Sequence, residues 1–128
     1  MKTLRLPWVW LGLWLLCVVF VVVVSLGPPA TVGPDVPASD KWMHLGTYFL
    51  LAAGAVQVFR PGRVLAGVAF GLVLLGIALE VGQGTLTEDR MMDWRDAIAN
   101  TLGVALGTAT LRLRARDALL RVAGRSAA

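Results

Sequence analysis

The chain has 128 residues, of which 57% are hydrophobic and 16% are charged, and its mean hydropathy is +0.72. A soluble domain of this size has too little interior to hide so much apolar surface, so we expect an integral membrane protein. The net charge is +4, but there is no P-loop, no GxGxxG and no zinc-type Cys/His spacing. We therefore expect no cofactor, and the single cysteine, Cys17, cannot form an intramolecular disulfide. We also expect no nucleic-acid partner, because the positive charge is distributed as membrane topology requires, as described below.

Four apolar segments are long enough to cross a bilayer, which takes roughly 20 residues of helix. The first has no charge between Arg5 and Asp35. A signal peptide is the alternative for this segment, but the apolar run is too long and no clear A-x-A site follows it. We therefore interpret it as a retained span. The predicted spans cover residues 8–26, 41–59, 64–83 and 93–113.

The segments between these spans carry turn and loop signals. Residues 27–39 hold four prolines and two glycines, which is typical of a non-helical loop. Arg60-Pro61-Gly62-Arg63 predicts a tight turn, and residues 84–90 a second loop. The basic tail, residues 114–128, either extends the fourth helix or lies on the membrane surface. The whole chain, residues 1–128, is expected to form one membrane domain.

The distribution of charge supports four crossings with both ends in the cytoplasm, because cytoplasmic segments are enriched in Lys and Arg. In that topology only Asp117 among the acids falls inside, and only Lys41, Arg90 and Arg95 among the bases fall outside. The predicted fold is thus an all-α integral membrane bundle of four transmembrane helices. The inside bases are Lys2, Arg5, Arg60, Arg63, Arg112, Arg114, Arg116, Arg121 and Arg125.

Two GxxxG motifs lie within the predicted spans. Gly67 and Gly71 form one, and Gly103 and Gly107 form the other. Helices in lipid associate where small residues let their backbones approach closely. We predict that both motifs are contact faces within the bundle, and they would also allow a homo-oligomer.

Polar and ionisable residues from three predicted helices gather at the outer depth of the membrane. Such residues are costly in a bilayer and usually functional. They recur at helical spacing, so that residues of one helix share a face. We call them the polar cluster: Asp40, Lys41, His44, Tyr48, Glu80, Gln83, Arg90, Asp93, Asp96 and Asn100.

Several members of the polar cluster have a simpler structural explanation. Asp93 or Asp96 could cap the fourth helix, and Asp40 the second. Lys41 and Arg90 could neutralise nearby carboxylates or touch lipid phosphates, whereas Gln83 and Asn100 could hydrogen-bond between helices. Glu80 is harder to explain this way, because an ionised carboxylate at that depth needs a partner. His44, the single histidine, could equally be structural.

Three motifs in this region resemble the VanZ-like family. They are Asp40-Lys41-Trp42-Met43-His44 with Tyr48, then Glu80-x-x-Gln83, then an R-x-x-D-x-x-D-x-x-A-N-x-x-G element over residues 90–103. The resemblance covers residues 40–107 and implies a multi-pass protein of the bacterial cytoplasmic membrane. The family is named for a protein associated with teicoplanin resistance, and the name carries no mechanism. The acidic loop before Arg90 departs from the family pattern, so contacts made there are in doubt.

Four functions are compatible with these residues. The first is a binding module in which the polar cluster holds an envelope component, such as a lipid-linked or cell-wall precursor headgroup, with Lys41 and Arg90 on its phosphate or carboxylate. The second is a hydrolase that uses His44, Glu80 and Asp96, through a metal with Asp40 as a further candidate ligand or through acid–base chemistry. The third candidate function is a transporter, and the fourth is a structural scaffold for a larger envelope complex. We rank the binding module first, with membrane lipid as the surrounding partner.

Overall fold

The computed structural model describes residues 1–27, 37–86 and 92–124, with only the backbone of residues 37–40. Throughout these ranges the regular structure is helical, which confirms the predicted all-α class. The short 3-10 helices η1, Thr110–Arg112, and η2, Arg114–Asp117, precede the last helix. The α-helices are α1 (Pro7–Leu26), α2 (Pro37–Val58), α3 (Arg63–Leu86), α4 (Trp94–Ala109) and α5 (Ala118–Ala123).

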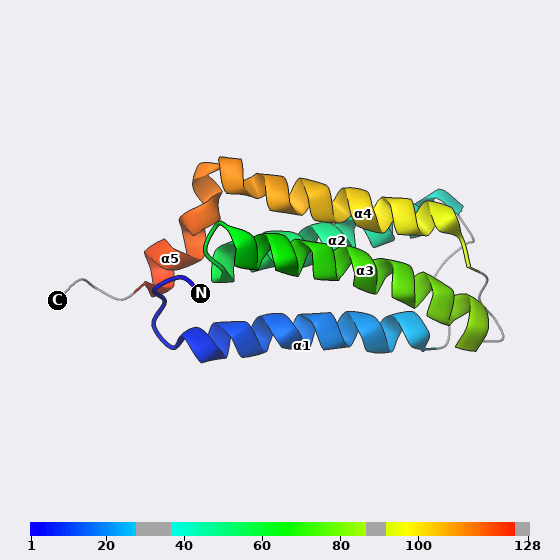
Figure 1. Ribbon diagram of the computed structural model, residues 1–128, viewed down its shortest axis with the longest axis horizontal. Helices are drawn as coiled ribbons and strands as arrows, with labels where there is room; N and C mark the ends of the chain where they lie inside the picture. The colour runs from blue at the N-terminus through cyan, green and yellow to red at the C-terminus, as the bar shows by residue number, and fades with distance from the viewer. Residues whose placement is uncertain (28–36, 87–91, 125–128) are drawn as a thin grey trace.

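The four long helices lie side by side and alternate in direction along the chain (Figure 1). The α2 helix contacts each of the other α-helices, and it packs most extensively against α4. Residues 110–123 turn across the end of the bundle that also carries residue 1 (Figure 1). The fourth helix therefore ends at Ala109 and is not extended by the basic tail. The Thr110 hydroxyl donates a 2.6 Å hydrogen bond to the Gly107 carbonyl, and the chain tightens into η1 at this point.

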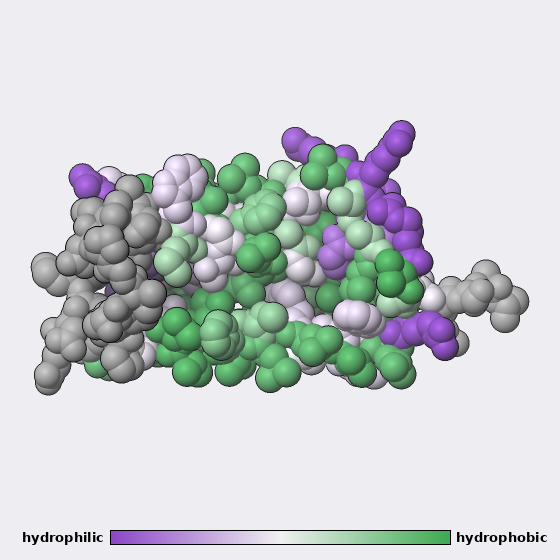
Figure 2. Space-filling model, turned by 180° about the vertical axis from the view of Figure 1, so that it is seen from behind, coloured by the Kyte–Doolittle hydropathy of each residue, from purple (hydrophilic) through white to green (hydrophobic). Residues whose placement is uncertain are grey.

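Two of the helices, α1 and α3, are long and apolar enough to cross a membrane. No residue of α1 is buried, and bulky side chains such as Trp8, Leu16 and Phe20 are between 64% and 74% exposed. An apolar belt lies between the two ends of the molecule (Figure 2). Soluble monomers rarely expose so large an apolar surface to water, whereas contact with lipid hydrocarbon carries no such cost. These helices support a membrane location.

One of the GxxxG motifs brings α4 into close contact with α2. A Cβ atom added at Gly103 would meet the Leu45 carbonyl oxygen, and one added at Gly107 would meet the Phe49 carbonyl oxygen. Both glycines are buried. The expected contact face at this motif is therefore present, and it places the first turns of α4 beside those of α2.

The other GxxxG motif does not pack inside this chain. Gly67 and Gly71 are exposed, and among the residues that the structure describes no atom lies within 4 Å of a Cβ added at either position. The prediction that they form a contact face within the bundle was wrong. The motif lies on a face of α3 that is not turned toward the neighbouring helices. The spacing of the glycines alone does not predict which face of a helix packs against a neighbour.

The turn between α2 and α3 agrees with the sequence. Gly62 has a backbone φ of 129°, a conformation that side chains with a Cβ rarely adopt. The turn brings α3 back along α2 after only four residues, so the polar ends of these two helices lie at the same end of the bundle.

The first residues of the chain are fixed against its last described ones. Leu4 forms an isolated β-bridge with Gly124 and is 1% exposed, and the Lys2 amide donates to the Val58 carbonyl at 2.9 Å. The Lys2 ammonium forms a 2.9 Å ion pair with Asp117. This hydrogen bond lowers the pKa of the Asp117 carboxyl below its ordinary value, and a bond from Arg116 acts in the same direction. The basic end of the bundle is therefore tied together by main-chain and side-chain bonds.

Candidate functional site

The polar cluster lies at the end of the bundle opposite to residue 1 and α5 (Figure 1). The first turns of α2 carry Lys41, His44 and Tyr48, and the last turns of α3 carry Glu80 and Gln83. Asp93, Asp96 and Asn100 belong to the start of α4. Alternation of helix direction brings these three segments to one level, as the helical spacing predicted. Two predicted members, the Asp40 side chain and Arg90, lie outside the described residues.

Lys41 joins α2 to the start of α4. Its ammonium lies 3.0 Å from a carboxylate oxygen of Asp93 and 3.0 Å from one of Asp96. Asp93 also caps α4, because its side chain accepts a 2.9 Å hydrogen bond from the Arg95 amide. The sequence had left open whether Asp93 caps α4 or forms part of a functional site. The structure shows the cap, and it also shows the ion pair with Lys41. Asp96 lies inside the first turn instead, where a negative charge is favourable near a helix N-terminus.

His44 connects all three helices of the site. Its Nδ1 atom lies 3.1 Å from the side-chain amide oxygen (Oδ1) of Asn100 and 3.7 Å from a carboxylate oxygen of Glu80. A carbonyl oxygen can only accept, so the bond to Asn100 requires the proton to be on Nδ1. The imidazole therefore bridges a buried carboxylate on α3 and a buried amide on α4.

Exposure decreases steadily from the rim of this site to its floor. The side chains of Lys41 and Asp93 are 38% and 39% exposed, whereas His44 is at 16%, Asp96 at 10% and Glu80 at 2%. Charged groups at the rim are thus accessible, and the carboxylate at the floor is shielded by protein. Burial of a carboxylate needs compensating polar contacts, and the His44 imidazole, 3.7 Å from Glu80, is one of them.

Tyr48 forms part of the floor beneath His44. It is 2% exposed, and its hydroxyl has no hydrogen-bond partner among the residues that the structure describes. Its ring lies against Gly76, where an added Cβ would be 3.3 Å from the Tyr48 ring and 3.1 Å from the Asn100 Cβ. Sequence reasoning did not single out Gly76. The available signal was its position four residues before Glu80, on the same helical face.

Gln83 closes the site on the side of α1. Its amide nitrogen donates a 2.9 Å hydrogen bond to the Ser25 carbonyl in the last turn of α1. Carbonyls in the last turn of a helix lack partners within the helix, so they are available to such a donor. This supports the explanation that Gln83 forms a hydrogen bond between helices. It also adds α1, which carries none of the three motifs, to the site.

Three members of the polar cluster could hold a metal ion. One ligand atom each of His44, Glu80 and Asp96 lies within 4.8 Å of the others. The sequence had suggested these three residues, with Asp40 as a further candidate ligand, and the Asp40 side chain lies outside the described residues. An imidazole with two carboxylates is a donor set that suits zinc, manganese or iron.

Comparison with protein-family models, with curated proteins and with solved structures gave no match for this chain. The resemblance to the VanZ-like family therefore rests on the three motifs alone. Six polar residues of those motifs lie in one site, although they come from three helices: Lys41, His44, Glu80, Asp93, Asp96 and Asn100.

Proposed function

We propose that this chain is a VanZ-like protein of the bacterial cytoplasmic membrane, with four spans and both ends in the cytoplasm. Two helices already have the length and composition of membrane spans. The α2 helix, with 22 residues, is about 33 Å long at 1.5 Å per residue, and the 16 residues of α4 cover about 24 Å before η1 extends them. Both run alongside α1 and α3, so a bilayer that holds two of the helices also surrounds the others.

The charges at the two ends of the bundle support this orientation. The end that carries residue 1 and α5 holds eight basic residues and Asp117 as its described acid. Cytoplasmic segments have this excess of positive charge, so the polar cluster is on the outer side. The eight are Lys2, Arg5, Arg60, Arg63, Arg112, Arg114, Arg116 and Arg121.

We further propose that the polar cluster binds the headgroup of an envelope component, such as a lipid-linked or cell-wall precursor. The observation that carries this proposal is the decrease in exposure from Lys41 and Asp93 at the rim to Glu80 at the floor. A headgroup entering from the outer surface would first meet the Lys41 ammonium and the Asp93 carboxylate. Such a rim favours a ligand with both an anionic group and several hydrogen-bond donors.

A thermal-shift titration of the detergent-purified protein tests this function. The ligands are a lipid-linked cell-wall precursor, common phospholipids and teicoplanin, which is included because of the family resemblance. A ligand at 100 times its dissociation constant stabilises the folded state by about 2.7 kcal/mol. We expect one of the envelope ligands to stabilise the wild type and an Asp117→Asn control, whose substitution lies at the opposite end.

The same ligand should fail to stabilise Glu80→Gln or Asp96→Asn. Equal stabilisation of all four proteins would place binding elsewhere in the chain. If no ligand stabilises any protein while both site variants unfold at lower temperature, the polar cluster is internal packing and the proposed function is wrong.

A second function, hydrolysis, is favoured by the grouping of His44, Glu80 and Asp96 within 4.8 Å. A divalent ion there could activate water, and His44 beside Glu80 could also act as an acid–base pair. Lys41 lies 3.0 Å from Asp96, so an incoming cation would compete with its ammonium. Stabilisation of the wild type by zinc or manganese, and not of His44→Gln, would put hydrolysis first. The absence of any metal response would leave headgroup binding as the function of this site.

A further inference from the structure

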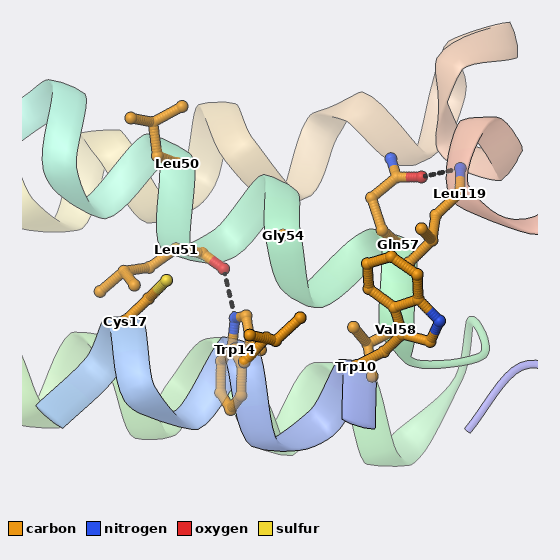
Figure 3. A pocket seen from close by; sticks show the side chains of 10 residues that line it. Trp10, Trp14, Cys17, Leu50, Leu51, Gly54, Gln57, Val58 and Leu119 are labelled. Atoms are coloured by element: carbon orange, nitrogen blue, oxygen red, sulfur yellow. Dashed lines mark hydrogen bonds between the residues drawn. The ribbon is translucent and has the colours of Figure 1, made fainter. Parts of the chain in front are cut away.

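A second site lies in the half of the bundle nearer to residue 1 and α5. A groove of about 270 Å³ runs between α1 and α2 and ends at α5 (Figure 3). On α1 it extends from Trp10 to Cys17, which is about 10 Å of helix. The floor is formed by Gly54, where an added Cβ would be 3.2 Å from the Trp14 ring. The absence of a side chain at this position lets the Trp14 ring lie directly against α2.

The polar groups along this groove are turned into the protein. The Trp14 ring nitrogen donates to the Leu51 carbonyl at 2.9 Å, and the Trp10 ring nitrogen donates to the Arg5 carbonyl at 3.1 Å. The Gln57 side chain accepts from the Leu119 amide at 3.1 Å, as Figure 3 shows, and donates to the Ala115 carbonyl at 3.0 Å. With these groups satisfied, the groove offers hydrocarbon and aromatic faces to an occupant. Its surface therefore suits an aliphatic chain better than a polar molecule.

Positive charge surrounds the end of the groove at α5. Arg121 follows the groove residue Leu119 by two positions, and its guanidinium donates to the Arg114 carbonyl at 3.0 Å. Arg5 is fixed beside them, because its amide donates to the Ala123 carbonyl at 2.7 Å. Within the described parts of the chain, none of these three arginines has a carboxylate at ion-pair distance. An anion at the end of the groove would meet positive charge from two segments.

We infer that this groove binds an anionic phospholipid, with one acyl chain between α1 and α2 and the phosphate against Arg114 and Arg121. The apolar lining recognises the chain and the arginines recognise the headgroup. Anionic lipids are attracted to basic segments next to a membrane, and each Lys or Arg changes the partition by about fivefold. The inference rests on the membrane placement proposed above and is independent of the ligand of the polar cluster.

The single cysteine makes the occupant measurable, because Cys17 lines the groove and is exposed. A fluorescent bimane group is attached to Cys17, and the protein is placed in nanodiscs of phosphatidylcholine. Phosphatidylglycerol or phosphatidylcholine with brominated acyl chains is then titrated in as a quencher. The control carries the probe at Val19→Cys in a Cys17→Ser background. Val19 is 55% exposed and points to the opposite side of α1.

We expect brominated phosphatidylglycerol to quench the probe at position 17 at lower lipid fractions than brominated phosphatidylcholine does, with no such preference at position 19. Arg114→Gln and Arg121→Gln should each reduce the preference about fivefold. Arg63→Gln, which removes an exposed charge from the turn at the same end, should leave it unchanged. Glu80→Gln should also leave it unchanged, even where it abolishes ligand binding at the polar cluster.

Three results would overturn the inference. Equal quenching by both lipids at both positions would mean that the groove meets only bulk lipid. A preference that Arg63→Gln removes as strongly as Arg121→Gln does would reflect general surface charge. If neither probe is quenched by any brominated lipid, the helix is not in the bilayer, and the membrane placement itself fails.

Discussion

Replacement of Gly107 by alanine should separate α4 from α2, and the structure allows the cost to be worked out. The added Cβ would meet the Phe49 carbonyl oxygen, the Ala52 Cβ at 2.7 Å and the Ala53 amide nitrogen at 3.0 Å. These are backbone atoms and a methyl group, so no rotation of a side chain can relieve the contact. Forcing extra volume into a packed contact typically costs about 1–3 kcal/mol.

Gly67 provides the matched control, because an alanine Cβ there meets nothing within 4 Å. Alanine is favoured over glycine in a helix by about 0.8–1.0 kcal/mol, and both variants receive this gain. The difference in unfolding free energy between Gly67→Ala and Gly107→Ala is therefore the packing cost alone, about 1–3 kcal/mol.

The measurement is a titration of the refolded protein in mixed micelles with a denaturing detergent, followed by circular dichroism. Gly67→Ala should unfold at the same or a higher detergent fraction than the wild type, and Gly107→Ala at a lower one. If both variants were at least as stable as the wild type and equal to each other, the close approach of α2 and α4 would be refuted. A loss at Gly67→Ala equal to that at Gly107→Ala would show that the exposed motif is packed against another surface.

Three further substitutions test the Lys2–Asp117 ion pair, the packing of Trp14 in the groove between α1 and α2, and the bond between His44 and Asn100 in the polar cluster. The folded-state pKa of Asp117 is lowered from 3.8 by Lys2, so its contribution to stability is complete above that pH and disappears as the pH falls through the lowered value. The stability difference between wild type and Asp117→Asn should accordingly vanish in acid, and a difference that persists there would contradict the ion pair. Trp14→Phe keeps an aromatic ring but loses the hydrogen bond to the Leu51 carbonyl, so detergent unfolding should show a loss of about 0.5–1.5 kcal/mol. Asn100→Ala leaves the neighbouring imidazole without its amide acceptor and should cost about 1–3 kcal/mol by the same assay, whereas a neutral result would mean that the imidazole finds another partner.

The helices could be predicted because their signal is local. The first and third apolar segments differ from α1 and α3 by no more than three residues at either end. The second was predicted to begin at Lys41, four residues after the start of α2 at Pro37, because a proline suits the first turn of a helix although it also suggests a loop. The side chains of the polar cluster were predictable in the same way, since helical spacing fixes which residues share a face.

What could not be predicted depends on which face of a helix meets which neighbour. Gly67 and Gly103 both begin a GxxxG motif, yet one faces outward and the other packs against the Leu45 carbonyl. The bond from Gln83 to the Ser25 carbonyl uses a backbone atom, which no residue pattern reports. The groove beside Gly54 could not be predicted either, because it depends on how the side chains of α1 pack against α2.

The contact between the beginning of the chain and α5 also sets an order on biogenesis. Lys2 and Asp117 are 115 positions apart in the sequence. At about 5–20 residues per second, translation reaches the second partner some 6–23 s after the first has been made. Throughout that interval the Lys2 ammonium lacks Asp117, and the Val58 carbonyl that accepts from its amide becomes available only about midway. The contact between Lys2 and Asp117 is consequently a late event, because it can form only after all four long helices have been synthesised.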